Sequence, residues 1–97
     1  MQLPAALTIA QAPQVLATLQ AALAQAPAGA PFVIDASALA ECDTSTIAVL
    51  LEARRDAQRR GLGFAVDQPP AKLRQLAALY GVEDLLALQA ADQTSAA

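Results

Sequence analysis

The stretch FVIDASALAECDTSTIAVLLEARRDAQRRG, residues 32–61, holds a strand pattern, a polar cluster and an amphipathic helix in immediate succession. Residues 32–34 form a continuous apolar run, typical of a central strand covered on both faces. After the polar residues 43–46, apolar side chains recur at helical spacing up to Gly61, where a left-handed cap would end a helix. This succession predicts a buried strand that leads, through a polar turn, into a helix.

The helix predicted after the polar cluster has an apolar face and a charged face. The apolar face contains Ile47, Leu50, Leu51, Ala53 and Ala57, and the charged face contains Glu52, Arg55, Asp56, Arg59 and Arg60. Acidic side chains are thus interleaved with the arginines, and the net charge of the chain is −3. Phosphate contacts need a whole face of clustered Lys and Arg, so we expect a solvated helix face and no nucleic-acid partner.

The remaining pattern predicts one α/β domain. Strands are expected at residues 6–10 and 62–67, and helices between Pro13 and the PAGAP run at residues 27–31, at residues 69–81 and, as a short terminal helix, at residues 82–88. The order β, α, β, α, β, α, α predicts a small, largely parallel sheet with helices packed on its faces. We expect a single domain over residues 1–90 and a flexible tail at residues 91–97.

The polar cluster consists of Asp43, Thr44, Ser45 and Thr46. Helix N-termini leave N–H groups without partners, so any of the first three could be a cap worth about 1 kcal/mol. One cap is sufficient, and the surplus of polar side chains favours a binding site at the carboxyl edge of the sheet, where Asp35 is also expected. Both interpretations, a simple cap and a binding site, remain open at this point.

Several kinds of chemistry are excluded by composition. The chain has no histidine and a single cysteine, Cys42, so it cannot form thiolate–imidazole metal sites or Ser-His-Asp and Cys-His catalytic units by itself. Asp35 and Asp43 could be imagined as paired carboxylates, but no base or electrophile accompanies them. We therefore expect no enzyme activity, no metal and no cofactor, and we expect Cys42 to act as a small, partly buried hydrophobic residue.

The cellular location follows from similar arguments. No apolar stretch reaches the roughly 18 residues of a membrane span, and the first residues lack the pattern of a secretory leader. A lone cysteine allows no disulfide within the chain. These features predict a cytoplasmic protein that does not insert into the membrane.

Residues 32–61 resemble the STAS domain, the fold shared by anti-sigma-factor antagonists and the cytoplasmic tails of sulfate transporters. The shared pattern is a buried strand ending in Asp, a short turn, and then Asp followed by Ser or Thr at the start of a helix. The segments LTI near the start and LRQLAALYGVEDLL near the end are most similar to the MlaB branch, the stand-alone STAS subunits of Mla phospholipid-transport ABC complexes. The resemblance covers most of the chain.

The resemblance implies a partner and a site. It places Thr44 at the position of the phosphorylatable STAS residue, and it implies docking on the ATP-binding subunit of an ABC transporter, hence a peripheral place at the inner membrane. We expect the docking surface to contain Asp43, Thr44, Ser45, Thr46 and Ala48. The alternative is a phosphorylation switch at Thr44 or Ser45 that controls release of a partner such as an anti-sigma factor. A small-ligand module is a minor option, because the start of the helix has no aromatic platform and no basic anchor.

Two departures from the family pattern have structural consequences. Thr46 stands where the family often has Gly, which makes the turn stiffer. The first hairpin of the family is reduced here to one short strand, which leaves a barer sheet edge that a partner or a second copy could cover. An apolar patch left without its partner also makes a homodimer of the isolated protein plausible.

Overall fold

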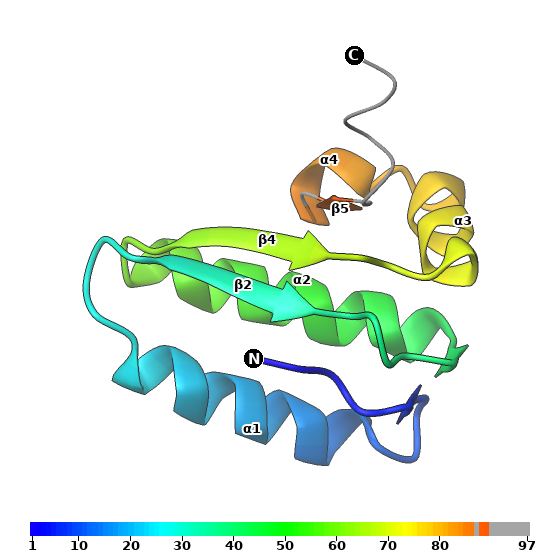
Figure 1. Ribbon diagram of the computed structural model, residues 1–97, viewed down its shortest axis with the longest axis horizontal. Helices are drawn as coiled ribbons and strands as arrows, with labels where there is room; N and C mark the ends of the chain where they lie inside the picture. Colours follow the sequence, from blue (N-terminus) through cyan, green and yellow to red (C-terminus); the bar gives the residue numbers. More distant parts are fainter. Residues whose placement is uncertain (87, 90–97) are drawn as a thin grey trace.

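The computed structural model describes residues 1–86 and 88–89 of the chain. Strands β2 (Pro31–Asp35), β4 (Gly63–Asp67) and β5 (Leu88–Gln89) form a parallel sheet in the order β2-β4-β5 (Figure 1). Strands β1 (Ala6–Leu7) and β3 (Glu41–Cys42) form a second, two-stranded parallel sheet. All strand pairs of the described residues are therefore parallel, and the predicted α/β architecture is confirmed.

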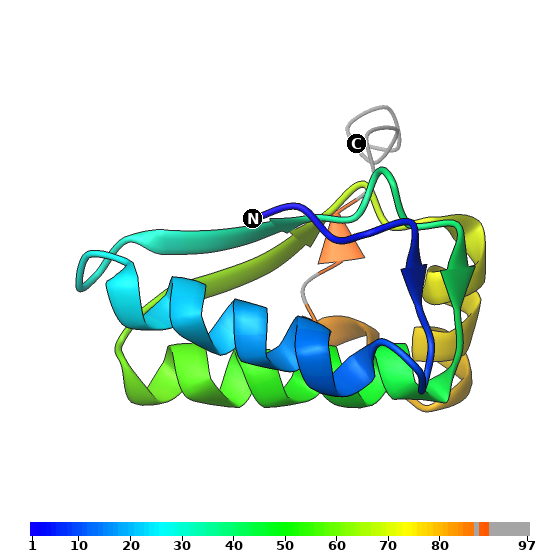
Figure 2. The same ribbon diagram turned by 90° about the horizontal axis from the view of Figure 1, so that it is seen from below.

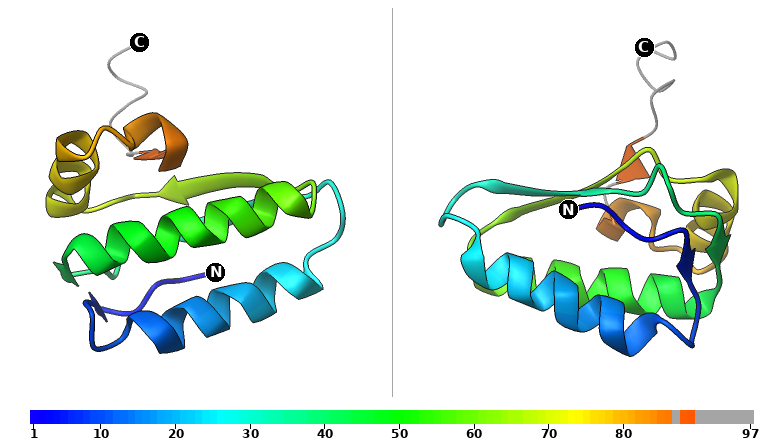
Figure 3. Two further views of the ribbon diagram at one scale, coloured as in Figure 1. Left: turned by 180° about the vertical axis from the view of Figure 1, so that it is seen from behind. Right: turned by 60° about the horizontal axis from the view of Figure 1, so that its bottom comes forward.

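The two long helices, α1 (Ala12–Gln25) and α2 (Thr44–Arg59), lie side by side on one face of the sheet (Figure 2). Helices α3 (Ala71–Leu79) and α4 (Glu83–Leu86) both contact α2 near its N-terminal end (Figure 3). The side chains of Ala53 and Ala57 on α2 are fully buried. Small residues at these positions let the helix approach its neighbours closely.

The prediction that the central strand is covered on both faces was wrong. Burial alternates along β2: Phe32 and Ile34 point into the core, whereas Pro31 is exposed and Val33 keeps 42% of its surface exposed. A continuous apolar run does not distinguish a strand buried on both faces from one that keeps an apolar residue on its outer face. Because α1 and α2 lie on the same side of the sheet, the outer side chains of β2 remain open to solvent.

Other element boundaries shifted for local reasons. The strand expected at residues 6–10 ends at Leu7, because the side-chain oxygen of Gln11 accepts hydrogen bonds from the N–H and the hydroxyl of Thr8 and turns the chain into α1. Strands β3 and β5 were not predicted, since two-residue strands carry no periodic signal. The terminal helix expected at residues 82–88 covers only Glu83–Leu86, and Leu88 belongs to strand β5 instead. The expected tail at residues 91–97 lies outside the described residues.

The first residues of the chain extend the sheet beside β2. The N–H of Asp35 donates to the C=O of Met1 (2.7 Å), and the N–H of Leu3 donates to the C=O of Asp35 (2.9 Å). Residues 1–3 therefore form an edge of the sheet, and α1 lies beyond this edge when the sheet is seen face on (Figure 1).

One residue of α2 lies elsewhere than predicted. Asp56 was expected on the solvated charged face, but it is only 5% exposed. Its Oδ1 accepts hydrogen bonds from Arg59 (3.0 Å) and Arg60 (3.2 Å), and these two long side chains cover it. None of the helices in the described ranges combines the length and the apolar character that a membrane crossing requires.

Candidate functional site

The turn between β3 and α2 is built as a reciprocal cap. Asp43 is the N-cap residue of α2, and its carboxylate accepts a hydrogen bond from the N–H of Ser45 (2.8 Å). The hydroxyl oxygen of Thr46 accepts in return from the N–H of Asp43 (3.1 Å). This is a capping box in which a threonine occupies the position usually held by Glu or Gln.

Thr46 is part of the interior of the protein. Its side chain is 0% exposed, and its hydroxyl donates a hydrogen bond to the C=O of Leu7 at the end of β1. The hydroxyl thus joins β1 to the first turn of α2 and is satisfied both as donor and as acceptor. The prediction that Thr46 belongs to the partner-contacting surface is corrected here, because a fully buried side chain cannot touch a partner.

Two side chains of the polar cluster, and Ala48 one turn further along α2, take no part in the cap and lie toward solvent. Thr44 and Ala48 are exposed and Ser45 is half-buried. Within the described residues, the hydroxyl groups of Thr44 and Ser45 have no hydrogen-bond partner. We call these three residues, Thr44, Ser45 and Ala48, the α2 ridge. The surplus of hydroxyl groups is smaller than the sequence suggested, since two of the four polar residues build the cap.

A shallow apolar groove runs along each side of the α2 ridge. The first, of about 320 Å³, lies between α2 and the α3–α4 connection and is lined by Thr44, Ile47, Ala48, Leu51, Tyr80 and Val82. The second, of about 370 Å³, lies between α2 and the start of α1 and is lined by Ala12, Pro13, Leu16, Ser45, Ala48, Val49 and Glu52. Ala48 borders both grooves. The α2 ridge therefore consists of small side chains and separates the two apolar grooves.

Tyr80 is a site residue that sequence reasoning did not include. Tyr80 is 50% exposed and lines the groove beside Thr44. The two residues are 36 positions apart, as their numbers show, and only the packing of α3 and α4 against α2 brings them together. An exposed aromatic residue directly before Gly81, at the end of an amphipathic helix, was the one available signal.

Asp35 lies at the carboxyl end of β2, as expected, but its carboxylate accepts hydrogen bonds within the turn that directly follows β2. Hydrogen bonding by Ser37, first through its side chain and then through its backbone N–H (2.9 Å to Oδ1), holds the pKa of Asp35 below its ordinary value. No hydrogen bond joins Asp35 to residues 43–46 in the described part of the chain. The two carboxylates instead accept hydrogen bonds within separate turns, Asp35 from Ser37 and Asp43 from Ser45.

Cys42 is buried at the end of β3, with 2% of its surface exposed. Burial raises the pKa of its thiol, which disfavours the reactive thiolate. Among residues 1–86 and 88–89, no group of three potential metal-binding side chains comes together. The site therefore consists of hydroxyl groups, a helix start and apolar grooves.

The fold and the exposed hydroxyl at the start of α2 define a STAS domain. Residues 1–88 match the model of the family described as "Mlab, STAS domain", and the chain belongs to this family. A solved structure described as an anti-sigma-factor antagonist (STAS) domain protein from Planctomyces limnophilus is similar in fold. Its TM-score is 0.78 at 16% sequence identity, over 97% of this chain and 83% of that chain. No curated protein matches the sequence at a significant level.

Proposed function

We propose that the protein is a non-enzymatic subunit of a Mla-type phospholipid ABC transporter and binds the ATP-binding subunit of that transporter through the α2 ridge. The observation that carries the proposal is the exposed Thr44 hydroxyl, free of partners within the described residues, on a ridge between two apolar grooves. Membership of the MlaB-type family supports an ABC transporter as the assembly. In this role the protein acts in the cytoplasm, at the inner membrane, and needs no cofactor.

The ridge suits close contact with a partner helix. Thr44 offers one donor and two acceptor positions, so it can bind a partner backbone without the desolvation of a charge. Ala48 has no side chain beyond Cβ, so a partner backbone can come near α2 at this point. The grooves on either side can take apolar side chains of the partner, and a buried, fully desolvated centre is where most binding energy is found in protein interfaces.

The experiment is the substitution Thr44→Glu, followed by co-purification with the ATP-binding subunit and a measured Kd. Glutamate in the first turn of a helix is stabilised by the helix dipole by about 0.3–1 kcal/mol, so the variant should fold at least as well as the wild type. A bulky charge on the ridge must be desolvated on docking, and we expect at least about a hundredfold loss of affinity.

Two matched variants separate docking from general charge effects. Gln58→Glu adds the same charge to an exposed position near the other end of α2, and it should leave binding unchanged. Thr44→Ser keeps the hydroxyl and should bind almost as well as the wild type. Undiminished binding of Thr44→Glu would contradict the proposed docking surface.

One observation also favours the alternative function, a phosphorylation switch. The Thr44 hydroxyl is exposed at the first residue of α2, where a kinase can reach it and where the helix dipole tolerates a phosphate. Ser45 is half-buried and therefore the less accessible of the two. Intact-mass measurement of the protein from its native cell distinguishes the functions: a stoichiometric phospho-form supports the switch, and an unmodified protein bound to the ATPase supports constitutive docking.

Without its partner, the protein leaves both grooves uncovered. We therefore expect the isolated chain to form weak homodimers through the α2 ridge. Sedimentation of the wild type and of Thr44→Glu tests this, since the added charge should abolish such a dimer.

A further inference from the structure

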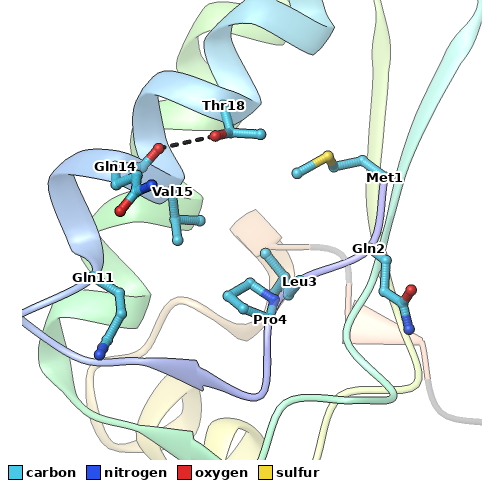
Figure 4. Close-up of a pocket in the computed structure, with 8 residues that line it drawn as sticks. All are labelled: Met1, Gln2, Leu3, Pro4, Gln11, Gln14, Val15 and Thr18. Atoms are coloured by element: carbon cyan, nitrogen blue, oxygen red, sulfur yellow. Dashed lines mark hydrogen bonds between the residues drawn. The ribbon is translucent and has the colours of Figure 1, made fainter.

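A third groove lies away from the α2 ridge, between the first residues of the chain and α1. It has a volume of about 470 Å³, and none of its lining residues belongs to either groove beside the ridge. Val15 and Thr18 of α1 face Met1 and Leu3 across it (Figure 4). Leu3 and Val15 are 1% and 8% exposed, so they form an apolar floor.

On the side of residues 1–3, the groove is bordered by a backbone edge that is unpaired at Gln2. Met1 C=O and Leu3 N–H both bond to Asp35 of β2, and successive residues of a strand direct their backbone groups to opposite sides. The N–H and C=O of Gln2 therefore point away from β2. Within residues 1–86 and 88–89 neither group has a hydrogen-bond partner. The edge thus presents one donor and one acceptor to an incoming strand.

The position of α1 gives an added strand something to pack on. Since α1 lies beyond the edge formed by residues 1–3 and one layer beneath the sheet, a strand placed beside Gln2 would lie over α1 (Figures 1 and 2). Every second side chain of such a strand would point into the groove. Pro4 has no N–H, so regular pairing ends there and the added strand is short.

The lining of the groove defines the chemistry of the occupant. Its polar side chains are neutral: Gln2, Gln11, Gln14 and Thr18. The side-chain oxygen of Gln11 accepts hydrogen bonds from the N–H and the hydroxyl of Thr8, which fixes the orientation of this amide. No charged side chain lines the groove, and the ammonium group of Met1 is held on the β2 side by the C=O of Val33 (3.2 Å). A charged side chain placed on the apolar floor would therefore lose water without gaining an ionic partner there. Amide groups beside an apolar floor suit the backbone and small apolar side chains of an extended peptide.

We propose that this groove binds an extended, uncharged peptide segment of a partner protein, which adds to the sheet beside Gln2 and places small apolar side chains on Leu3 and Val15. A second copy of the chain fits less well. Paired edge to edge, the copy would bring its own α1, which lies beyond its own edge in the same way, into the space under the new strand pair. A peptide brings no such helix.

The test uses short synthetic peptides with the full-length protein. Acetylated and amidated peptides of about eight residues, roughly 26 Å when extended, alternate Thr with Val, Ala or Leu. We expect at least one of them to shift the amide NMR signals of Gln2, Val15 and Thr18 and, at saturation, to slow hydrogen exchange of the Gln2 N–H at least about tenfold. Absence of binding by all three peptides, or signal shifts confined to the α2 ridge, would overturn the proposal.

Two kinds of control examine the binding mode. Two derivatives of the best-binding peptide are made, one with backbone N-methyl groups on all Thr residues and one with N-methyl groups on all the alternating apolar residues. In an added strand only one of these two sets of N–H groups faces the edge, so only one of the derivatives should bind more weakly. Equal effects of both would refute strand addition. In the protein, Thr18→Arg fills the groove and should weaken binding at least about tenfold, whereas Ala17→Arg, at the adjacent exposed position outside the groove, should not.

The outcome does not depend on the proposed transporter role. Thr44→Glu should leave peptide binding intact, because the α2 ridge and this groove share no residue. Protection of the Gln2 N–H in a dimer without any peptide would replace the proposed occupant by a second copy and would also overturn the proposal.

Discussion

The substitution Thr46→Val examines how the polar turn of α2 is held in place. Valine has nearly the shape of threonine but lacks the hydroxyl, so the core keeps its packing while two hydrogen bonds disappear. These are the bond donated to the C=O of Leu7 and the bond accepted from the N–H of Asp43. The Thr46 side chain is fully buried, so water cannot replace the lost partner at Leu7 without a change of structure.

The magnitude follows from the burial of these two groups. Leaving a buried acceptor unsatisfied costs about 1–3 kcal/mol, and the N–H of Asp43, which is only half-buried, should add less than this. We therefore expect Thr46→Val to lower the free energy of unfolding by roughly 2–3 kcal/mol, or the melting temperature by about 10 °C. Urea denaturation followed by circular dichroism measures the first quantity.

Thr46→Ser is the matched variant. Serine keeps both hydrogen bonds and loses one buried methyl group, which should cost about 1 kcal/mol. The expected order of stability is wild type, then Thr46→Ser, then Thr46→Val. A Thr46→Val variant as stable as Thr46→Ser would refute the reasoning, because loss of the hydroxyl would then cost no more than loss of a methyl group, about 1 kcal/mol, and less than the expected cost of an unsatisfied buried acceptor.

Three further predictions concern the stability of the same domain and are checked by urea denaturation. Asp43→Ala removes the N-cap of α2 and should cost about 1 kcal/mol, with no loss expected for Asp43→Asn, which can still cap. Asp56→Ala removes the shared acceptor of Arg59 and Arg60. Because both guanidinium groups reach solvent, this change should lower the free energy of unfolding by only about 1 kcal/mol. A loss above about 3 kcal/mol would contradict the assumed screening by solvent. The pKa of Cys42 is raised in the folded state, so the contribution of the protonated thiol to stability is complete below the unfolded pKa and is lost as the pH rises through the folded pKa. As the pH rises above the ordinary thiol pKa of about 8.5, the wild type should therefore lose more stability than Cys42→Val. Parallel curves for the two proteins would contradict this prediction.

The predicted helices agree well with the structure because each carries a local signal. The apolar stripe of α1, the proline at its start and the amphipathic pattern of α2 all arise within a few turns of chain. Strands β1 and β3 pair only two residues each, and β5 contributes two residues at the far edge of the sheet. Such short strands exist because neighbouring backbone is present to pair with, which no local pattern records.

The candidate site was found only in part. The position of Thr44 at the start of a helix follows from the sequence, since a polar cluster before an amphipathic run is a local feature. The sequence does not show which side chains of the cluster build the cap and which remain exposed. Thr46 is buried because β1 passes over the first turn of α2 and offers the C=O of Leu7, 39 positions earlier in the chain. Thr44 faces the opposite way and remains exposed.

By itself, then, the sequence determined the helices, the parallel order of strands and helices and the place of the hydroxyl cluster, because hydrophobic periodicity and capping act over a few residues. Only the tertiary structure decided which hydroxyl is buried, that the sheet is covered by long helices on one face, and that Tyr80 shares a groove with Thr44. These features depend on contacts between residues far apart in the chain, and packing in three dimensions is what brings such residues together.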